Sequence, residues 1–131
     1  MRIDDYCEVK CLPEFNKDMK KLCKRYRTLE GDLETFLNTQ IILYHIQGVD
    51  NKGVVQISGL GIEEPKIYKA IKFACRFLAG TGSRSGIRLI YAYKEIPDDK
   101  DEVILIEIYY KEDKENEDRD RIYKYYKDKD K

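Results

Sequence analysis

Hydrophobic and polar positions in the first third of the chain predict one strand followed by two helices. Residues 6–11 alternate between apolar and polar side chains with a period of two, which is typical of a strand. From Pro13 onward, apolar residues recur every three or four positions, which predicts a helix that begins at this proline. A second stripe of this kind predicts another helix over residues 31–45. Because only a tight joint around residues 28–32 separates the helices, we expect them to form a hairpin.

The rest of the chain favours strands, followed by one charged helix. Residues 67–77, 87–94 and 103–110 are rich in β-branched, aromatic or alternating apolar residues, and a glycine-rich loop and a polar turn separate them. Glycines and a proline interrupt the stretch before them, where only residues 54–57 have strand character. The last segment gathers acids at its start and lysines at its end, which complements a helix dipole.

These elements predict one α+β domain over residues 1–131, with a helical hairpin packed on a small, mostly antiparallel sheet in the order β-α-α-β-β-β-α. Its predicted parts are an N-terminal strand and helical hairpin (6–46), a glycine-rich insert (47–65), a three-stranded basic sheet (67–110) and a charged C-terminal helix (112–128). With 42% hydrophobic residues, the chain is expected to fold around a core and not to be disordered.

The chain shows no sign of a membrane segment or a cofactor. No apolar run approaches the roughly 20 residues that cross a bilayer, and the first residues lack the apolar core of a secretion signal, so we expect a cytoplasmic protein. The four cysteines are expected to be free thiols, mostly buried as small hydrophobic side chains. The spacing of Cys7 and Cys11 leaves a metal site or a disulfide as alternatives.

Charge is distributed unevenly along the chain. The 25 basic and 25 acidic residues cancel, yet residues 66–94 contain basic residues and no acid. These basic residues are Lys66, Lys69, Lys72, Arg76, Arg84, Arg88 and Lys94. Strand alternation places Lys72, Arg76, Arg88 and Lys94 on the sheet face that the helical hairpin leaves open. Such a face is typical of a polyanion site, and an ordinary solvated surface is the alternative.

Three consecutive stretches carry a resemblance to a known family. They read IYKAIKFACR at 67–76, SGIRLIYAY at 85–93 and IEIYYKEDKEN at 106–116. Together they resemble the RelE/ParE family of toxins from type II toxin–antitoxin systems, above all its RelE/HigB branch. There, a Gly-x-Arg-x-x-Tyr strand follows a basic strand and a Gly/Ser-rich loop. The resemblance implies a ribosome-dependent endoribonuclease, an mRNA interferase that inhibits translation and is bound by a cognate antitoxin protein.

The resemblance also implies roles for particular residues. Cations on the sheet hold the scissile phosphate while the neighbouring 2′-hydroxyl attacks it, and the matching positions here are Arg88, Arg76, Lys72 and Lys111. Further RNA contacts are expected from Lys69, Arg84, Lys94, Lys114, Tyr110 and Tyr123. A lysine among other cations loses its proton more readily, so Lys72 or Lys111 is a candidate base, as is Tyr110. The single histidine, His45, is not expected to act in catalysis.

Two departures from the family leave other functions open. Glu112 and Asp113 follow Lys111, where RelE has an arginine. RelE also has a tyrosine soon after that lysine, whereas the nearest downstream tyrosine here is Tyr123. An alternative is therefore the same fold without RNase activity, either as a ParE-like inhibitor of DNA gyrase or as a relic that binds only its antitoxin. A nucleic-acid-binding domain without toxicity is a third hypothesis.

Tyr91 belongs to the motif, but it shares a face with apolar neighbours and is expected in the core.

Overall fold

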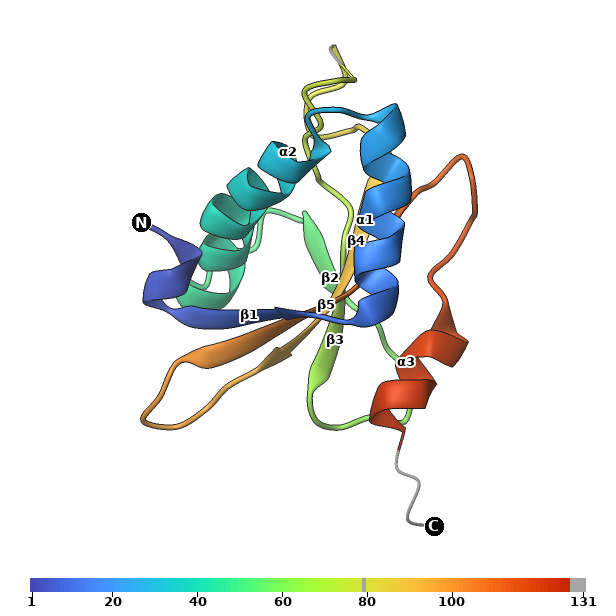
Figure 1. Ribbon diagram of the computed structural model, residues 1–131. Helices are drawn as coiled ribbons and strands as arrows, with labels where there is room; N and C mark the ends of the chain where they lie inside the picture. The colour runs from blue at the N-terminus through green and yellow to red at the C-terminus, as the bar shows by residue number, and fades with distance from the viewer. Residues whose placement is uncertain (79, 128–131) are drawn as a thin grey trace.

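The computed structural model describes residues 1–78 and 80–127, and within them three helices accompany a five-stranded mixed sheet (Figure 1). The elements are η1 (Ile3–Asp5), β1 (Cys7–Cys11), α1 (Pro13–Arg25), α2 (Leu29–Phe36), η2 (Leu37–Ile46), β2 (Val54–Gln56), β3 (Lys66–Ala70), β4 (Ile87–Lys94), β5 (Asp101–Tyr110) and α3 (Arg119–Tyr126). The predicted α+β class is confirmed. The predicted first strand, helical pair and last two strands are confirmed to within two residues at each end.

The sheet has the strand order β1-β5-β4-β3-β2. Among the five strands of the described residues, β1 pairs with β5 in parallel and the other three pairings are antiparallel, so the prediction of a mostly antiparallel sheet is confirmed. The short strand predicted near residue 54 is present as β2, which adds an edge strand to the expected order. β1 runs beside residues 101–105 only. The second half of β5 therefore has β4 on one side and no strand on the other.

The helical pair covers one face of the sheet (Figure 1). α1 begins at Pro13, whose missing N–H is not needed at the first helical position, and it buries Phe15 and Leu22. α2 starts two residues earlier than expected and continues directly into η2, a π-helical segment in which the Gln47 N–H bonds to the Ile42 carbonyl. Between the helices and the sheet lies the larger apolar cluster, which includes the predicted core residue Tyr91.

The opposite face of the sheet is not open, contrary to the sequence-based expectation. A second apolar cluster lies there, formed where residues 57–62 and α3 cross the sheet. Its buried members are Leu60, Ile67, Ile90, Ala92, Ile106, Tyr109 and Ile122. The expectation failed because α3 and the glycine-rich insert carry apolar side chains that this face can bury, a gain of about 25 cal/mol for each Å² removed from water.

The strand predicted over residues 67–77 ends at Ala70, which is a correction. Beyond it, the backbone leaves β4 and turns toward the start of α2. The Arg76 N–H bonds to the Asp32 carboxylate at 3.1 Å, and the Phe77 N–H bonds to the Thr28 hydroxyl at 2.8 Å. Side chains of the helical hairpin satisfy these donors, and the segment keeps an alternation of buried and exposed residues up to Arg76 with only an isolated bridge between Phe73 and Arg84 among the described residues.

The C-terminal helix is shorter than the predicted 112–128. α3 begins after Asp118, whose side chain accepts the Arg121 N–H at 3.0 Å as a helix cap. Residues before this cap are held as a loop, because the Asp118 N–H bonds to the buried carboxylate of Glu107 at 2.8 Å. The last residue of the prediction, residue 128, lies outside the described residues.

The cysteines are free thiols, as predicted. Cys7 and Cys75 are buried, whereas Cys11 is exposed and does not follow the expected pattern. Within residues 1–78 and 80–127, no group of three His, Cys, Asp or Glu side chains is arranged to hold a metal ion. None of the helices in this described part is long and apolar enough to cross a membrane.

His45, near the end of η2, lies in a cage of tyrosines. Its Nε2 is 2.7 Å from the Tyr91 hydroxyl, and its ring stacks on Tyr93 with centroids 3.8 Å apart. Burial lowers the pKa of His45 to about 4, and the negative charge of Asp101 opposes this shift only in part. The histidine is therefore neutral at physiological pH and acts as a packing residue.

We expect the free energy of unfolding to fall as the pH decreases from 6.5 to about 4.5. An unfolded histidine has a pKa near 6.5, above the folded value of about 4, so the unfolded state binds more protons in this window. The loss should be on the order of 2 kcal/mol, since one pKa unit corresponds to about 1.4 kcal/mol. Urea unfolding at several pH values measures it, and His45→Gln should flatten the slope. An unchanged slope in that variant contradicts this role for His45.

Candidate nucleic-acid interface

The cations predicted to form one surface lie at both ends of the sheet. Arg88 and Lys94 share a face of β4, but six residues at a rise of about 3.3 Å separate them by roughly 20 Å. Lys94 lies opposite Glu102 in the β4–β5 pairing, next to the turn at residues 95–100. The expectation that Lys72, Arg76, Arg88 and Lys94 meet on one open face is therefore wrong.

Lys72 and Arg76 lie on the side of the helical hairpin. Both line a cavity of about 440 Å³ that α2 and η2 close from the other side. The Lys72 ammonium donates to the Asn51 carbonyl at 2.6 Å, and Arg76 Nε donates to Asp32 Oδ1 at 2.8 Å. Burial alone would raise the pKa of Asp32, but hydrogen bonds from Arg76 and Thr28 hold it below its usual value. Arg76 thus has an ionised partner, while its own side chain remains 68% exposed.

Arg88 and Lys111 come close together where β4 begins and β5 ends. Arg88 is the register partner of Tyr109, and the Lys111 N–H bonds to the Gly86 carbonyl at 2.9 Å, which puts both cations on one face. Gly86 has a φ of 88°, and a Cβ there would lie 2.9 Å from Tyr110 Cε1 and 3.3 Å from Lys111 Cγ. The glycine of the motif therefore makes room for Lys111. Arg88 Nη1 itself donates to the Ile71 carbonyl at 3.2 Å.

Three aromatic rings join this corner to the end of α1. Tyr26 makes edge-to-face contacts with Phe77 and with Tyr110, at centroid distances of 6.2 and 5.7 Å. Arg25 lies 5.0 Å from the Tyr26 ring, and Arg27 lies 5.7 Å from the Phe77 ring. Phe77 is 44% exposed, which is unusual for a ring so close to the core.

These contacts define a basic end of the molecule. Figure 1 shows the end of α1, the start of α2 and the described parts of the connection between β3 and β4 (71–78 and 80–86) together at the top of the view. The cations of the basic end are Arg25, Arg27, Lys72, Arg76, Arg84, Arg88 and Lys111, and its rings are Tyr26, Phe77 and Tyr110.

The other end of the sheet is acidic. A cavity of about 570 Å³ beside the β4–β5 turn has four acids and one base in its lining: Asp4, Glu8, Asp99, Glu102 and Lys100. Although the numbers of basic and acidic residues are equal, the two signs of charge are therefore separated along the strands. A polyanion meets attraction at the basic end and repulsion at the opposite one.

The remaining predicted RNA contacts are engaged elsewhere. Lys69 is mostly buried, and its ammonium lies 3.1 Å from Glu117 Oε1; burial alone would lower the pKa of Lys69, but this carboxylate raises it. Lys114 forms an ion pair with Glu107, which is buried. Tyr123 packs against the second apolar cluster. These side chains attach residues 114–126 to the sheet.

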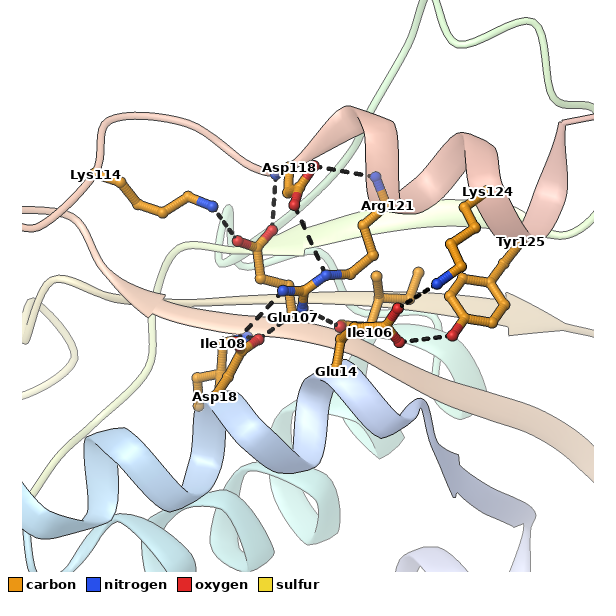
Figure 2. Close-up of polar contacts among 10 residues, drawn as sticks. All are labelled: Glu14, Asp18, Ile106, Glu107, Ile108, Lys114, Asp118, Arg121, Lys124 and Tyr125. Atoms are coloured by element: carbon orange, nitrogen blue, oxygen red, sulfur yellow. Dashed lines mark hydrogen bonds and ion pairs between the residues drawn. The ribbon is translucent and has the colours of Figure 1, made fainter.

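α3 is fixed to the sheet by polar contacts along β5 (Figure 2). The Arg121 guanidinium donates to Asp18 at 2.7 Å and to the Ile106 carbonyl at 2.8 Å, and Asp18 also accepts the Ile108 N–H at 3.3 Å. Together, the two side chains satisfy backbone groups on the part of β5 that β1 does not reach. At the far end of α3, hydrogen bonds from Tyr125 and Lys124 lower the pKa of Glu14 to about 2.

A cavity of about 380 Å³ opens beside these contacts, between α1, β5 and the loop before α3. We call it the edge cavity. Its charged lining residues are Asp18, Lys21, Arg25, Glu107, Asp113, Lys114 and Arg121. Because it shares Arg25 and Tyr110 with the basic end, the two sites are continuous.

Sequence reasoning missed part of this site. Tyr26, Arg25 and Arg27 were not singled out, because a basic last turn of a helix is common and only tertiary contacts reveal its neighbours. A signal for Glu107 did exist, since it is the one charged residue in the apolar run 103–110, and a buried acid needs partners.

Comparisons of the chain with protein-family models, with curated proteins and with solved structures found no match. The chemistry available at the basic end is phosphate and base recognition. Guanidinium groups offer forked donors that fit phosphate oxygens, and aromatic faces stack on bases. His45 contributes nothing there, because it is bonded to Tyr91.

Replacing Arg121 with alanine should destabilise the protein by about 2 kcal/mol, because it leaves Asp18 and the Ile106 carbonyl without this partner in a partly buried position. Urea unfolding measures the loss, and hydrogen exchange should rise in α3 first. Arg119→Ala is the matched control, since that side chain is 47% exposed and should cost less than about 1 kcal/mol. Equal losses in the two variants would show that Arg121 is not the anchor.

Proposed function

We propose that the protein is a toxin of the RelE/ParE type, from its RelE/HigB branch, that inhibits translation as a ribosome-dependent mRNA endonuclease. The observation that carries this proposal is the basic end, where Arg25 and Arg27 contact a cluster of three aromatic rings and further cations lie at the same end of the sheet. RNA provides both kinds of group that this surface fits, because its phosphates attract cations and its unpaired bases stack on aromatic faces.

The order of the elements supports the proposal. The described chain runs from a strand through two helices and a group of strands to a final helix, an α+β arrangement that is compatible with the order the resemblance implies once β2 is counted as an added strand. The added strand, β2, lies at the sheet edge, so it leaves the pairing of β3, β4 and β5 undisturbed. β1 lies beside the last strand, which brings the helical hairpin over the centre of the sheet.

The positions of the motif residues support it as well. Arg88 and Lys111, which the resemblance assigns to the scissile phosphate, share one corner of the sheet with Gly86 of the motif between them. In this proposal they stabilise the charge that develops as the 2′-hydroxyl attacks. Arg76 and Arg84 bind flanking phosphates, and Tyr110 and Phe77 stack on bases. Lys72 lies away from this corner, in the cavity beside α2, and contacts only the margin of the bound RNA.

The proposal implies partners and a compartment. Ribosomes and mRNA are its targets, and a cognate antitoxin protein is needed to keep the producing cell alive. All of them are cytoplasmic. The basic end suits an antitoxin segment with acidic side chains, because such a segment competes directly with RNA phosphates.

A second candidate is the same fold without RNase activity, either a ParE-like gyrase inhibitor or a relic that binds only its antitoxin. It is favoured by the acids that already engage cations of the basic end. Arg25 is paired with Asp113, one of the acids that follow Lys111, and Arg76 is paired with Asp32. Counter-charges of this kind weaken phosphate binding, and they therefore count against RNA cleavage at this surface.

Substituting Arg88 by alanine should abolish translation inhibition on induction in bacteria, together with the new transcript ends that mark cleavage. The affinity for single-stranded RNA should fall by about tenfold. The slope of the logarithm of the binding constant against the logarithm of the salt concentration should become less steep by about 0.7, as expected when one phosphate contact is lost. Lys66→Ala is the matched control, because Lys66 is an exposed cation of β3 at the other end of the sheet and should bind RNA normally.

The outcomes separate the two candidates. Transcripts that stay intact while DNA damage signals rise would support the gyrase inhibitor. Harmless expression of the wild type, together with tight binding of a neighbouring gene product, would support the relic. An RNA affinity that is indifferent to salt, or equally reduced by Lys66→Ala, rules out the basic end as the RNA site.

A further inference from the structure

We infer that the edge cavity is a subsite that binds a single nucleotide, with the base against Tyr110 and the free edge of β5 and the phosphate at Lys21 and Arg25. The inference rests on the proposed function, because the RNA on the basic end would supply the nucleotide. The two sites meet at Arg25 and Tyr110, which belong to both.

The free edge of β5 offers hydrogen bonds to a ligand. The Lys111 N–H points to β4, so by alternation the backbone groups of Ile108 and Tyr110 point to the cavity side. There, Asp18 binds the Ile108 N–H, and the Tyr110 carbonyl accepts the N–H groups of Asp113 and Lys114 at 2.9 and 3.4 Å. Among the described residues, no side chain or loop backbone bonds to the Ile108 carbonyl or the Tyr110 N–H. One acceptor and one donor therefore face the cavity, which matches the polar edge of a nucleobase.

The charges around the cavity favour an anion. Three of its cations are paired within the lining: Arg121 with Asp18, Lys114 with Glu107 and Arg25 with Asp113. The fourth, Lys21, is exposed and forms no ion pair within the described part of the chain. One positive charge is thus left over at the mouth of the cavity. A phosphate group is the natural counter-charge there.

The cavity also has an aromatic wall of suitable size. Tyr110 is half-buried, and Arg25 lies 5.8 Å from the centre of its ring. A volume of about 380 Å³ falls within the range of about 300 to 1,000 Å³ that small-ligand sites occupy. A base that leaves the RNA stack can therefore enter and stack on this ring.

A nucleotide fits the cavity better than an extended peptide. A peptide strand that adds to a sheet edge needs a row of free backbone groups, usually over at least about three residues. Here only Ile108 and Tyr110 contribute such groups. Asp18 and Arg121 close one side and the turn at Asp113 closes the other. The opening therefore suits a compact ligand.

The test is calorimetric titration of the full chain with each of the four ribonucleoside 5′-monophosphates, with ribose 5-phosphate, with inorganic phosphate and with an acidic decapeptide. At least one nucleotide should bind about tenfold more tightly than ribose 5-phosphate, which is the gain expected from stacking one base. Lys21→Ala should lower the affinity for that nucleotide by about tenfold, because a charged contact is lost. Lys20→Ala, an exposed neighbour on α1 that does not line the cavity, should change it by less than about twofold.

Each alternative result overturns the inference. Equal affinity for phosphate and nucleotides would show a simple anion site, tighter binding of the peptide would show a docking site, and equal effects of the two lysine variants would place the ligand elsewhere. Its failure is distinguishable from failure of the proposed function. If RNA is cleaved but mononucleotides do not bind, only the subsite is wrong. If mononucleotides bind as expected but no RNA is cleaved, only the proposed activity is wrong.

Discussion

The structure depends on how the second half of β5 satisfies its backbone hydrogen bonds. β1 stops at Cys11, opposite Leu105, so the polar groups of residues 106–110 have no strand beside them on that edge. Unpaired backbone groups are costly where water is excluded. Asp18 of α1 and Arg121 of α3 satisfy two of them with side-chain hydrogen bonds, and in doing so they bind α3 across the sheet. The same arrangement leaves the last part of the edge uncovered, which creates the edge cavity. One short strand thus determines both the position of α3 and the presence of a cavity next to the basic end.

Much of the fold could be predicted from the sequence, because the local periodicity of apolar and polar residues indicates most of its elements. The stripe that starts at Pro13 and the alternation over residues 87–94 both produced the expected elements. The prediction failed where backbone N–H groups bond to side chains of distant elements and not to a neighbouring strand. Residues 71–77 alternate like a strand, yet Asp32 and Thr28 accept the N–H groups of Arg76 and Phe77, and nothing local in the sequence indicates those partners. Similarly, the glycine-rich insert has little periodicity, so its covering of the second sheet face through Leu60 could not be foreseen.

The candidate site was predictable only in part, for a related reason. An acid-free run of 29 residues shows that the chain concentrates positive charge, but strand alternation alone does not show at which end of a strand a side chain lies near others. Arg88 and Lys94 share a face and still lie at opposite ends of the sheet. Conversely, Arg25 and Tyr110 are far apart in the sequence, and the Tyr26 ring brings them together. Charge density was visible in the sequence, whereas its position required the fold.

Whether a cation near an acid can still bind phosphate depends on how exposed the cation is. Lys69 has an 18% exposed side chain, and its partner Glu117 is 6% exposed, so a phosphate would have to displace a carboxylate in a site that water hardly reaches. Arg76 and Arg25 also have carboxylate partners, but their side chains are 68% and 48% exposed. Ion pairs open to water contribute about 1 kcal/mol or less, and a guanidinium has donors beyond those that one carboxylate uses. The acids of the basic end therefore leave Arg76 and Arg25 accessible to a phosphate group, whereas Glu117 removes Lys69 from the surface.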